Sequence, residues 1–267
     1  MQDRYVGDAG DFGKYGLLRH LGRASGCRTD LKLGVIWYLV DDESGNEDGR
    51  HLSYLGDPAL RDCHSELHGV LKEIVEGGER CVSSIEQRSV LPEGTVFFSE
   101  RLPSNGPMAR IVRTANRQEW FERALLTTRD CNFIFLDPDN GLEIASAPRG
   151  SARSHKYVLM QEVRLLVARR QSVLVYQHMH RRAPHKSQVT EGLAGLREAF
   201  PDAPSIVAIT FRRGSARTFF LLTSPSQDTL LRERLAGLCR SGWASLFEIS
   251  YATRQPMYET GQRRPGP

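Results

Sequence analysis

The sequence of 267 residues contains little cysteine, no long apolar run and no internal repeat. Its five cysteines include no Cys-x-x-Cys pair, which argues against a zinc ribbon or a disulfide framework and indicates a reducing compartment. No segment approaches the roughly eighteen apolar residues that a membrane span needs, and the first residues show no charged and apolar leader. We therefore expect a soluble, cytoplasmic protein without a membrane partner.

The composition is that of an ordinary globular protein, with 40% hydrophobic and 25% charged residues. No linker rich in Pro, Gly or Ser divides the chain, so we expect one α/β domain over residues 1–252. Residues 253–267 are rich in Arg, Gly and Pro and are expected to be disordered. The net charge of +4 is mildly basic and permits a polyanionic partner, DNA or RNA.

Apolar runs typical of buried strands alternate along the chain with helical patterns, which predict helices over residues 58–75, 108–127, 154–169 and 187–200. The expected strands are residues 33–40, 95–98, 131–136, 172–178, 205–211 and 218–223. The last two are joined by only six residues, 212–217, so they must form an antiparallel hairpin. A mostly parallel series that ends in such a hairpin is the layout of the Rossmann-like methyltransferase sheet.

Three carboxylates follow directly after the apolar run 131–136, at Asp137, Asp139 and Glu143. Crowded carboxylates repel one another and are costly to bury without partners, so they are expected to face water, a cation or a polar substrate. Open α/β sheets place their binding sites at this end of their strands. The stretch therefore predicts a functional site, and its alternative interpretation is a surface turn.

Four glycines and a lysine lie close together in the opening segment, residues 5–16. This composition predicts a glycine-rich loop that leads into a helix at Leu17, with Asp11 as the N-cap. Backbone N–H groups at a helix N-terminus bind anions, and Lys14 would add a point charge for a carboxylate.

The segment from Tyr5-Val6-Gly7-Asp8 to Phe12-Gly13-Lys14-Tyr15-Gly16-Leu17-Leu18 resembles the opening segment of the adenine-N6 amino-methyltransferases, and Asp137-Pro138-Asp139-Asn140 resembles their Asp-Pro-Pro-aromatic motif. The strand order is similar to that of the ribosomal RNA adenine-N6 methyltransferases. The resemblance implies S-adenosylmethionine as the cofactor and a nucleic acid or nucleotide-like substrate. It assigns cofactor binding to Gly10, Gly13 and Lys14. It assigns catalysis to Asp137, Asp139 and Asn140, which would grip the target amino group.

Two features depart from that family pattern. Asp139 and Asn140 replace the second proline and the aromatic residue of the Asp-Pro-Pro-aromatic motif, so a base would lose a stacking contact of roughly 1–3 kcal/mol. An acidic loop, residues 41–49, stands where a glycine-rich turn is expected after the first strand. Asp41 in this loop is the candidate for binding a ribose hydroxyl.

A second interpretation uses the carboxylates as ligands of a metal ion. Asp137, Asp139, Glu143, His178 and His180 would lie on one rim of a parallel sheet and could bind Mg²⁺ or Mn²⁺. Such ions activate water for phosphodiester cleavage, which predicts a metal-dependent nuclease or phosphodiesterase. A third interpretation is a catalytically silent nucleic-acid-binding or partner subunit.

Basic residues gather in the loops beside the last predicted strands, chiefly Arg181, Arg182, Arg212 and Arg213. Because these loops flank the predicted site, the four arginines are candidates for contacts with the phosphates of DNA or RNA. A solvated basic face is the alternative explanation.

Overall fold

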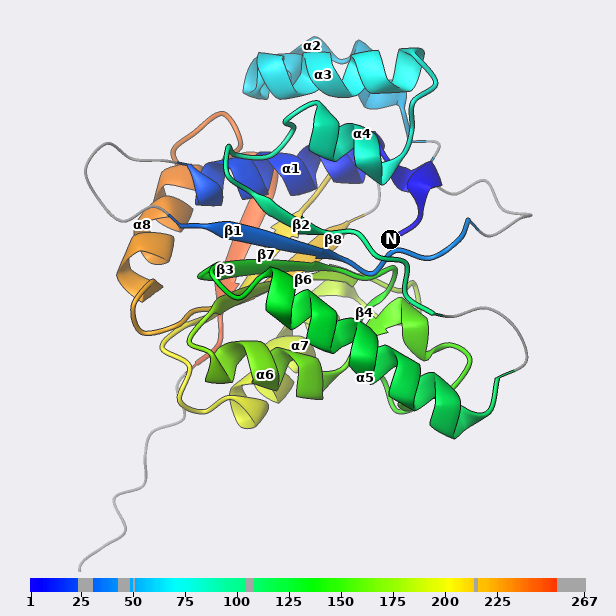
Figure 1. The fold of residues 1–267 in the computed structure, drawn as a ribbon. Coiled ribbons are helices and arrows are strands. Elements are labelled where there is room, and N and C mark those ends of the chain that lie inside the picture. The colour runs from blue at the N-terminus through cyan, green and yellow to red at the C-terminus, as the bar shows by residue number, and fades with distance from the viewer. Residues whose placement is uncertain (24–30, 43–48, 50, 104–107, 214–215, 254–267) are drawn as a thin grey trace, which may run out of the picture.

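A seven-stranded mixed sheet runs through the centre of the molecule (Figure 1). The computed structural model describes residues 1–23, 31–42, 49, 51–103, 108–213 and 216–253. The strands lie in the order β2 (Val96–Phe98), β1 (Leu33–Trp37), β3 (Phe133–Asp137), β6 (Ser172–His178), β8 (Arg217–Leu222), β7 (Ile206–Phe211) and β9 (Phe247–Tyr251). Strands β2, β1, β3 and β6 are parallel, and β8 is antiparallel to both of its neighbours. The predicted α/β fold with an antiparallel C-terminal hairpin is confirmed.

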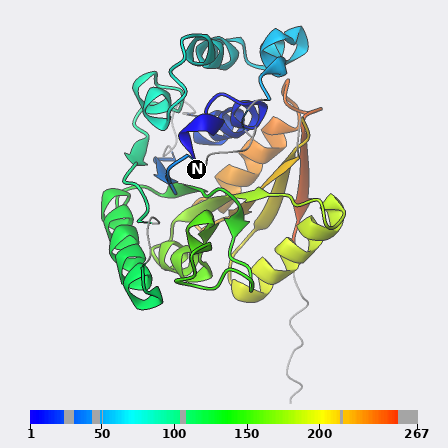
Figure 2. The ribbon, with the colours of Figure 1, turned by 90° about the vertical axis from the view of Figure 1, so that its right-hand side faces the viewer.

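Helices cover both faces of this sheet (Figure 2). Helices α1 (Ala9–Gly22) and α8 (Asp228–Leu238) lie on one face. Helices α5 (Arg110–Thr127), α6 (Met160–Ala168) and α7 (His185–Ala199) lie on the other. None of the described helices is long and apolar enough to cross a membrane.

A further helical layer covers α1 from outside. It consists of α2 (Pro58–Cys63), α3 (Ser65–Glu76) and α4 (Val82–Gln87), and α3 packs directly on α1. Because α1 lies between this layer and the sheet, twelve of its fourteen residues are buried. The predicted single helix over 58–75 breaks at His64, which caps α3 by accepting a hydrogen bond from the backbone of Leu67.

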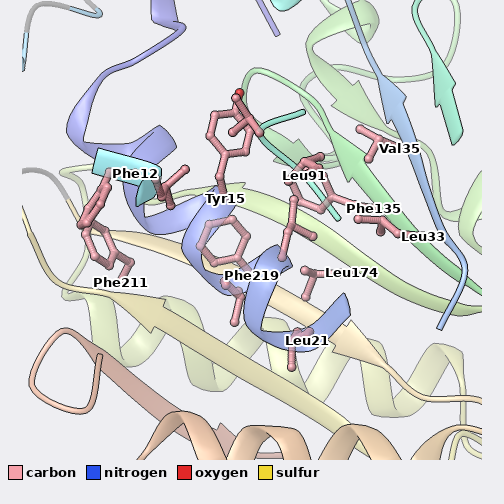
Figure 3. Close-up of a cluster of buried hydrophobic side chains, with 14 of the residues drawn as sticks. Phe12, Tyr15, Leu21, Leu33, Val35, Leu91, Phe135, Leu174, Phe211 and Phe219 are labelled. Atoms are coloured by element: carbon pink, nitrogen blue, oxygen red, sulfur yellow. The ribbon is translucent and has the colours of Figure 1, made fainter. Parts of the chain in front are cut away.

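Side chains alternate between two hydrophobic cores because successive residues of a strand point to opposite faces. Phe133 and Phe135 of β3 join the core under α1 and α8, whereas Ile134 and Leu136 join the core under α5, α6 and α7. Figure 3 shows the first of these cores, in which Phe12, Tyr15 and Leu21 of α1 meet strand side chains that include Phe135 and Phe219.

Several elements differ from the sequence-based expectation. Helices α4 and α8 and the edge strand β9 were not anticipated, and β9 pairs antiparallel with β7. The predicted helix over 154–169 holds only from Met160. Before it come a short 3₁₀ turn (Ser154–Lys156) and strand β5 (Tyr157–Val158), which pairs with β4 (Gly141–Leu142). Two other 3₁₀ turns span Asp3–Tyr5 and Ser53–Gly56. The tail 254–267, expected to be disordered, lies outside the described residues.

Candidate functional site

A cavity of about 830 Å³ opens at the carboxyl ends of β3 and β6. The first residues of α1 and of β8 complete its wall, because α1 starts and the reversed strand β8 begins at this same edge. This is the edge at which open α/β sheets hold their ligands. Asp137, Pro138, Asp139 and Asn140 all line the cavity, so the predicted carboxylate stretch is part of a concave site.

The start of helix α1 contributes three charged side chains spaced by three residues. Asp8 is the N-cap, and its carboxylate accepts a hydrogen bond from the backbone N–H of Asp11 at 2.9 Å. Asp8, Asp11 and Lys14 therefore lie on one side of the helix, towards the strand ends. All three side chains are buried yet line the cavity. The prediction that Asp11 is the N-cap of a later helix is wrong by one turn.

Two ion pairs join this helix to the sheet. The Lys14 ammonium lies 2.7 Å from Asp11 Oδ1 and 2.8 Å from Asp137 Oδ2, which links α1 to β3. The Arg217 guanidinium lies 2.7 Å from Asp8 Oδ2, which links β8 to the N-cap. Charged groups this deeply buried require partners of this kind.

Asp139 is held by the first two residues of the chain. Its carboxylate lies 2.7 Å from the N-terminal ammonium of Met1 and accepts a hydrogen bond from Gln2 Nε2, also at 2.7 Å. Burial by itself would raise the pKa of Asp139, but the ammonium and the hydrogen bond outweigh burial and lower that pKa. Asp139 is therefore ionised at neutral pH.

The floor of the cavity, defined here as its buried charged groups, holds one more carboxylate than cations, whereas the half-buried Lys156 and the exposed Arg181 line the rest of the cavity. The carboxylates are Asp8, Asp11, Asp137 and Asp139, and the cations are Lys14, Arg217 and the Met1 ammonium. Burial raises the pKa of Asp137 despite Lys14, and burial also raises the pKa of Asp8 despite Arg217. A ligand that brings positive charge to this floor would relieve the surplus.

The predicted glycine-rich loop is wrong, because residues 9–22 form helix α1. Its glycines allow close packing. A Cβ atom at Gly13 would lie 2.6 Å from the ring of Phe211, and one at Gly10 would overlap the guanidinium of Arg217. Neither glycine therefore forms an anion-binding loop, and Lys14 is already paired with two carboxylates.

The end of β1 also differs from the expectation. The Met1 ammonium donates to the carbonyl of Tyr38 at 2.8 Å, and the backbone N–H of Val40 donates to the carbonyl of Met1 at 3.0 Å. The first residue of the chain thus lies where a glycine-rich turn was expected. Asp41 is exposed, and its carboxylate lies 3.2 Å from the guanidinium of Arg101.

Backbone hydrogen bonds fix the loop at Asn140 on two sides. Its N–H donates to the carbonyl of Lys156 at 2.9 Å, and its carbonyl accepts from the N–H of His178 at 3.0 Å. Gly141 follows with φ +121°, where any side chain would be strained and would collide with Gln177. The loop therefore presents Pro138 and Asn140 to the cavity in a fixed geometry.

A buried ion pair supports this loop from behind. Arg117 of α5 and Glu162 of α6 form two hydrogen bonds of 2.8 and 2.9 Å, and the Tyr38 hydroxyl donates to Glu162 at 2.9 Å. Arg117 also donates to the carbonyls of Ser154 and Tyr157, on either side of Lys156.

Sequence reasoning missed Arg117, Glu162, Asp8 and Arg217. Only Asp8, a typical N-cap residue before a helical pattern, carried a readable signal.

The side chains that were candidate metal ligands have separate hydrogen-bond partners. Glu143 accepts a hydrogen bond from the backbone of Met160 at 2.8 Å, and His180 Nδ1 accepts one from the backbone of Arg182 at 3.2 Å. His178 Nδ1 lies 3.5 Å from the Tyr176 hydroxyl. Within the described ranges, no three His, Cys, Asp or Glu side chains are grouped to hold a metal ion.

Two of the four predicted phosphate-binding arginines are paired with carboxylates. Arg181 lines the cavity, and Arg182 follows it in the same exposed turn. Arg212 pairs with Glu248, and Arg213 pairs with Asp57. Phosphate contacts by these residues stay a prediction.

Comparisons with known proteins are sparse. No protein-family model matches the chain, and no curated protein matches its sequence. A solved structure from Legionella pneumophila strain Philadelphia 1, protein LPL1258 of the family DUF519, aligns with 93% of this chain and 98% of its own. The two chains share 12% sequence identity, and the TM-score of their alignment is 0.44.

Proposed function

We propose that the cavity is the site of an S-adenosylmethionine-dependent methyltransferase that acts on an amino group of a nucleic acid or nucleotide-like substrate. The observation that carries this proposal is the surplus carboxylate on the cavity floor. S-adenosylmethionine carries a sulfonium, an ammonium and a carboxylate, so its net charge is positive and compensates that floor. The strand order, with reversed strand β8 between β6 and β7, agrees with this class of fold.

The described residues fit such a ligand in size and charge. The volume of about 830 Å³ falls within the range of roughly 300–1,000 Å³ that ligand pockets occupy. Lys14 and Arg217 are the cations that would receive the ligand's carboxylate, and Asp8 and Asp11 are the carboxylates that would receive its ammonium. Because α1 offers no glycine-rich loop, these side chains would hold the carboxylate and the ammonium of S-adenosylmethionine. When bound, S-adenosylmethionine would supply an electrophilic methyl group.

The carboxylate stretch would hold the substrate amino group. Asp137 lines the cavity beside Lys14, and Asn140 lines it from a loop whose backbone is fixed, so both side chains would accept hydrogen bonds from an amino group. Position 140 offers no aromatic ring for stacking. Tyr5 and Tyr176 also line the cavity, and we expect one of them to stack on the substrate base.

Calorimetry with two ligands of different charge tests the proposal. S-adenosylhomocysteine lacks the sulfonium and has no net charge, so we expect S-adenosylmethionine to bind at least tenfold more tightly at pH 7. Asp137→Asn, which removes the surplus charge, should reduce this preference. Asp62→Asn, at an exposed carboxylate on α2, should not.

The same titrations separate the competing functions. Absence of heat with millimolar S-adenosylmethionine, or equal affinity for the two ligands, would reject the proposal. Binding of Mg²⁺ or Mn²⁺ that Asp137→Asn and Asp139→Asn abolish would instead favour the metal-dependent phosphodiesterase. Binding of nucleic acid without binding of cofactor or metal would favour a silent partner subunit.

A further inference from the structure

The cavity of about 830 Å³ has a basic mouth outside its buried floor. His180, Arg181 and His185 line the cavity and are exposed to solvent, whereas the carboxylates of the floor are buried. Lys156 is half-buried and lines the cavity from the 3₁₀ turn Ser154–Lys156. Positive side chains therefore lie near the opening of the cavity, and the surplus of negative charge lies deeper.

Gln188 of helix α7 fixes the turn that carries Arg181. Its Oε1 accepts a hydrogen bond from the backbone N–H of His180 at 3.1 Å, and its Nε2 donates to the carbonyls of His180 and Ala183, both at 2.8 Å. The turn, residues 180–183, is thus held at both ends without a ligand. Because its backbone is already ordered, a ligand that binds there loses little affinity to ordering of the turn.

His180 supplies a hydrogen-bond donor at the same place. Its Nδ1 accepts a hydrogen bond from the backbone N–H of Arg182 at 3.2 Å, so the proton of the neutral ring is on Nε2. Nε2 is then the atom with which this ring donates to a ligand. Helix α7 begins at His185, so the positive end of its dipole also lies at the mouth. Both features favour an anion there.

The positive charge of Arg181 is available to such an anion. Two other arginines of this region, Arg212 and Arg213, are paired with carboxylates. Within the described ranges, no carboxylate pairs with Arg181. An arginine on an open surface is typically only solvated. Arg181 instead stands on a fixed turn at the mouth of a cavity, so its guanidinium can donate to a ligand inside that cavity.

We propose that the mouth binds a phosphate ester group of the substrate, while the amino group of the same substrate lies on the floor. The inference rests on the proposed function and names its substrate as a nucleotide, not a nucleoside or a free amine. Arg181, Lys156 and His180 offer a guanidinium, an ammonium and an imidazole N–H. Such a set of donors suits the negative charge and the several acceptor oxygens of a phosphate.

The charges of the cavity argue against other placements of the phosphate. On the floor it would meet the carboxylates of Asp137 and Asp139, which would repel it. The carboxylate of S-adenosylmethionine has its own candidate cations on the floor, Lys14 and Arg217. The cations at the mouth are therefore left for the substrate.

Calorimetry that compares each nucleotide with its nucleoside tests the phosphate site. The probes are AMP, CMP and GMP with their nucleosides, because all three bases carry an exocyclic amino group. We expect at least one nucleotide to bind about tenfold more tightly than its nucleoside at low salt, the effect of a hydrogen bond to a charged group. Arg181→Ala should remove about that tenfold preference and leave binding of the nucleoside as it is in the parent.

Three further variants make the test specific. Arg182→Ala removes the same charge from the same turn, but this residue is not in the lining of the described cavity, so the preference for the nucleotide should persist. His180→Asn keeps a side-chain oxygen that accepts from the backbone of Arg182 but lacks the Nε2–H donor, so it should weaken nucleotide binding alone. Arg129→Ala, at an exposed arginine after α5, is the control for net charge. Because all these positions are exposed, thermal unfolding of the variants should match the parent.

A labelled single-stranded oligonucleotide of about twelve residues identifies the source of the phosphate. If the substrate is a nucleic acid, the oligonucleotide should bind more tightly than any nucleotide in fluorescence anisotropy, and Arg181→Ala should weaken that binding. If the substrate is a free nucleotide, its phosphomonoester carries more charge than a diester and should bind more tightly than the oligonucleotide. Either result supports a phosphate site.

The proposal fails if no nucleotide binds more tightly than its nucleoside. It also fails if Arg181→Ala and Arg182→Ala weaken binding equally, which would show only a general attraction to positive charge. Calorimetry with S-adenosylmethionine keeps the two proposals apart. A parent protein that prefers nucleotides through Arg181 but does not bind S-adenosylmethionine would remove only the methyltransferase. One that binds S-adenosylmethionine without this preference would remove only the phosphate site.

Discussion

The ammonium of Lys14 lies 2.8 Å from the carboxylate of Asp137, at the floor of the cavity at the strand ends. This pair joins the first helix to a central strand that comes 123 residues later. Both side chains are at least 96% buried, so the pair is shielded from solvent screening. The ion pair therefore contributes both to the stability of the fold and to the charge of the site.

Replacing Lys14 with methionine should destabilise the protein by about 3–5 kcal/mol, because Asp11 and Asp137 would stay buried without their cation. Urea denaturation measures the change in the free energy of unfolding. Lys72→Met on α3 is the control, since its pair with Glu76 is exposed and is worth about 0–1 kcal/mol. The double variant Lys14→Met/Asp137→Asn should recover part of the loss. A single variant as stable as the parent would show that the pair is not required.

Adding one methyl group at Gly13 should destabilise the protein by about 1–3 kcal/mol, although alanine is the better helix former. The new Cβ would lie 2.6 Å from the ring of Phe211, which has no room to move between α1 and the sheet. Gly69→Ala in α3 is the matched change, because nothing lies within 4 Å of its added Cβ, and it should stabilise by about 0.5–1 kcal/mol. Thermal unfolding of the two variants should therefore shift in opposite directions.

Breaking the pair between Arg117 and Glu162 should also cost about 3–5 kcal/mol, because every strong donor and acceptor in this network is buried. Glu162→Gln keeps the shape of the side chain and isolates the effect of the charge. The exposed pair between Arg123 and Glu100 provides the control, with an expected change below about 1 kcal/mol. Equal losses in the buried and the exposed pair would contradict this account.

Binding of S-adenosylmethionine should weaken on acidification at a pH above the ordinary carboxyl value of 3.8. Burial raises the pKa of Asp137 and of Asp8, so in the folded protein these groups take up protons before ordinary carboxyls do. Each proton removes negative charge from the floor and therefore affinity for a cationic ligand. Calorimetry across this pH range checks the direction, and affinity that stays constant down to pH 4 would contradict it.

Stability should show the opposite dependence for the same two groups. Their folded pKa values lie above the unfolded value, so the native state binds more protons between those values, and their contribution to the free energy of unfolding falls as pH rises through that window. Asp139 works in the other direction, because its pKa is lowered and its contribution is lost as pH falls below 3.8. Asp139→Asn should therefore flatten the acid limb of a stability profile.

The sheet was largely readable from the sequence, because buried strands such as 172–178 and the hairpin between β7 and β8 are apolar runs with short connections. Only the second half of helix α1, from Leu17, was readable. The glycines of its first half lower helix propensity, and the close approach of Arg217, Phe211 and Trp243 explains why they occur in a helix. Strand β9 was missed because its partly exposed residues lack a continuous apolar pattern.

The site was predicted in part. The local stretch around Asp137 indicated a functional strand end, and the structure places it in the cavity of about 830 Å³. Its partners could not be found from the sequence, because Lys14, Arg217 and Met1 meet these carboxylates only through tertiary packing. The spacing of residues along the chain does not indicate such contacts.

The ion pair between Asp8 and Arg217 spans 209 residues of the chain and has a consequence for synthesis on the ribosome. Arg217 is made 209 residues after Asp8, so Asp8 stays without this partner until then. The cavity floor cannot be complete before strand β8 has left the ribosome and inserted between β6 and β7. A ligand for this cavity would therefore recognise only chains in which β8 has already been made and inserted.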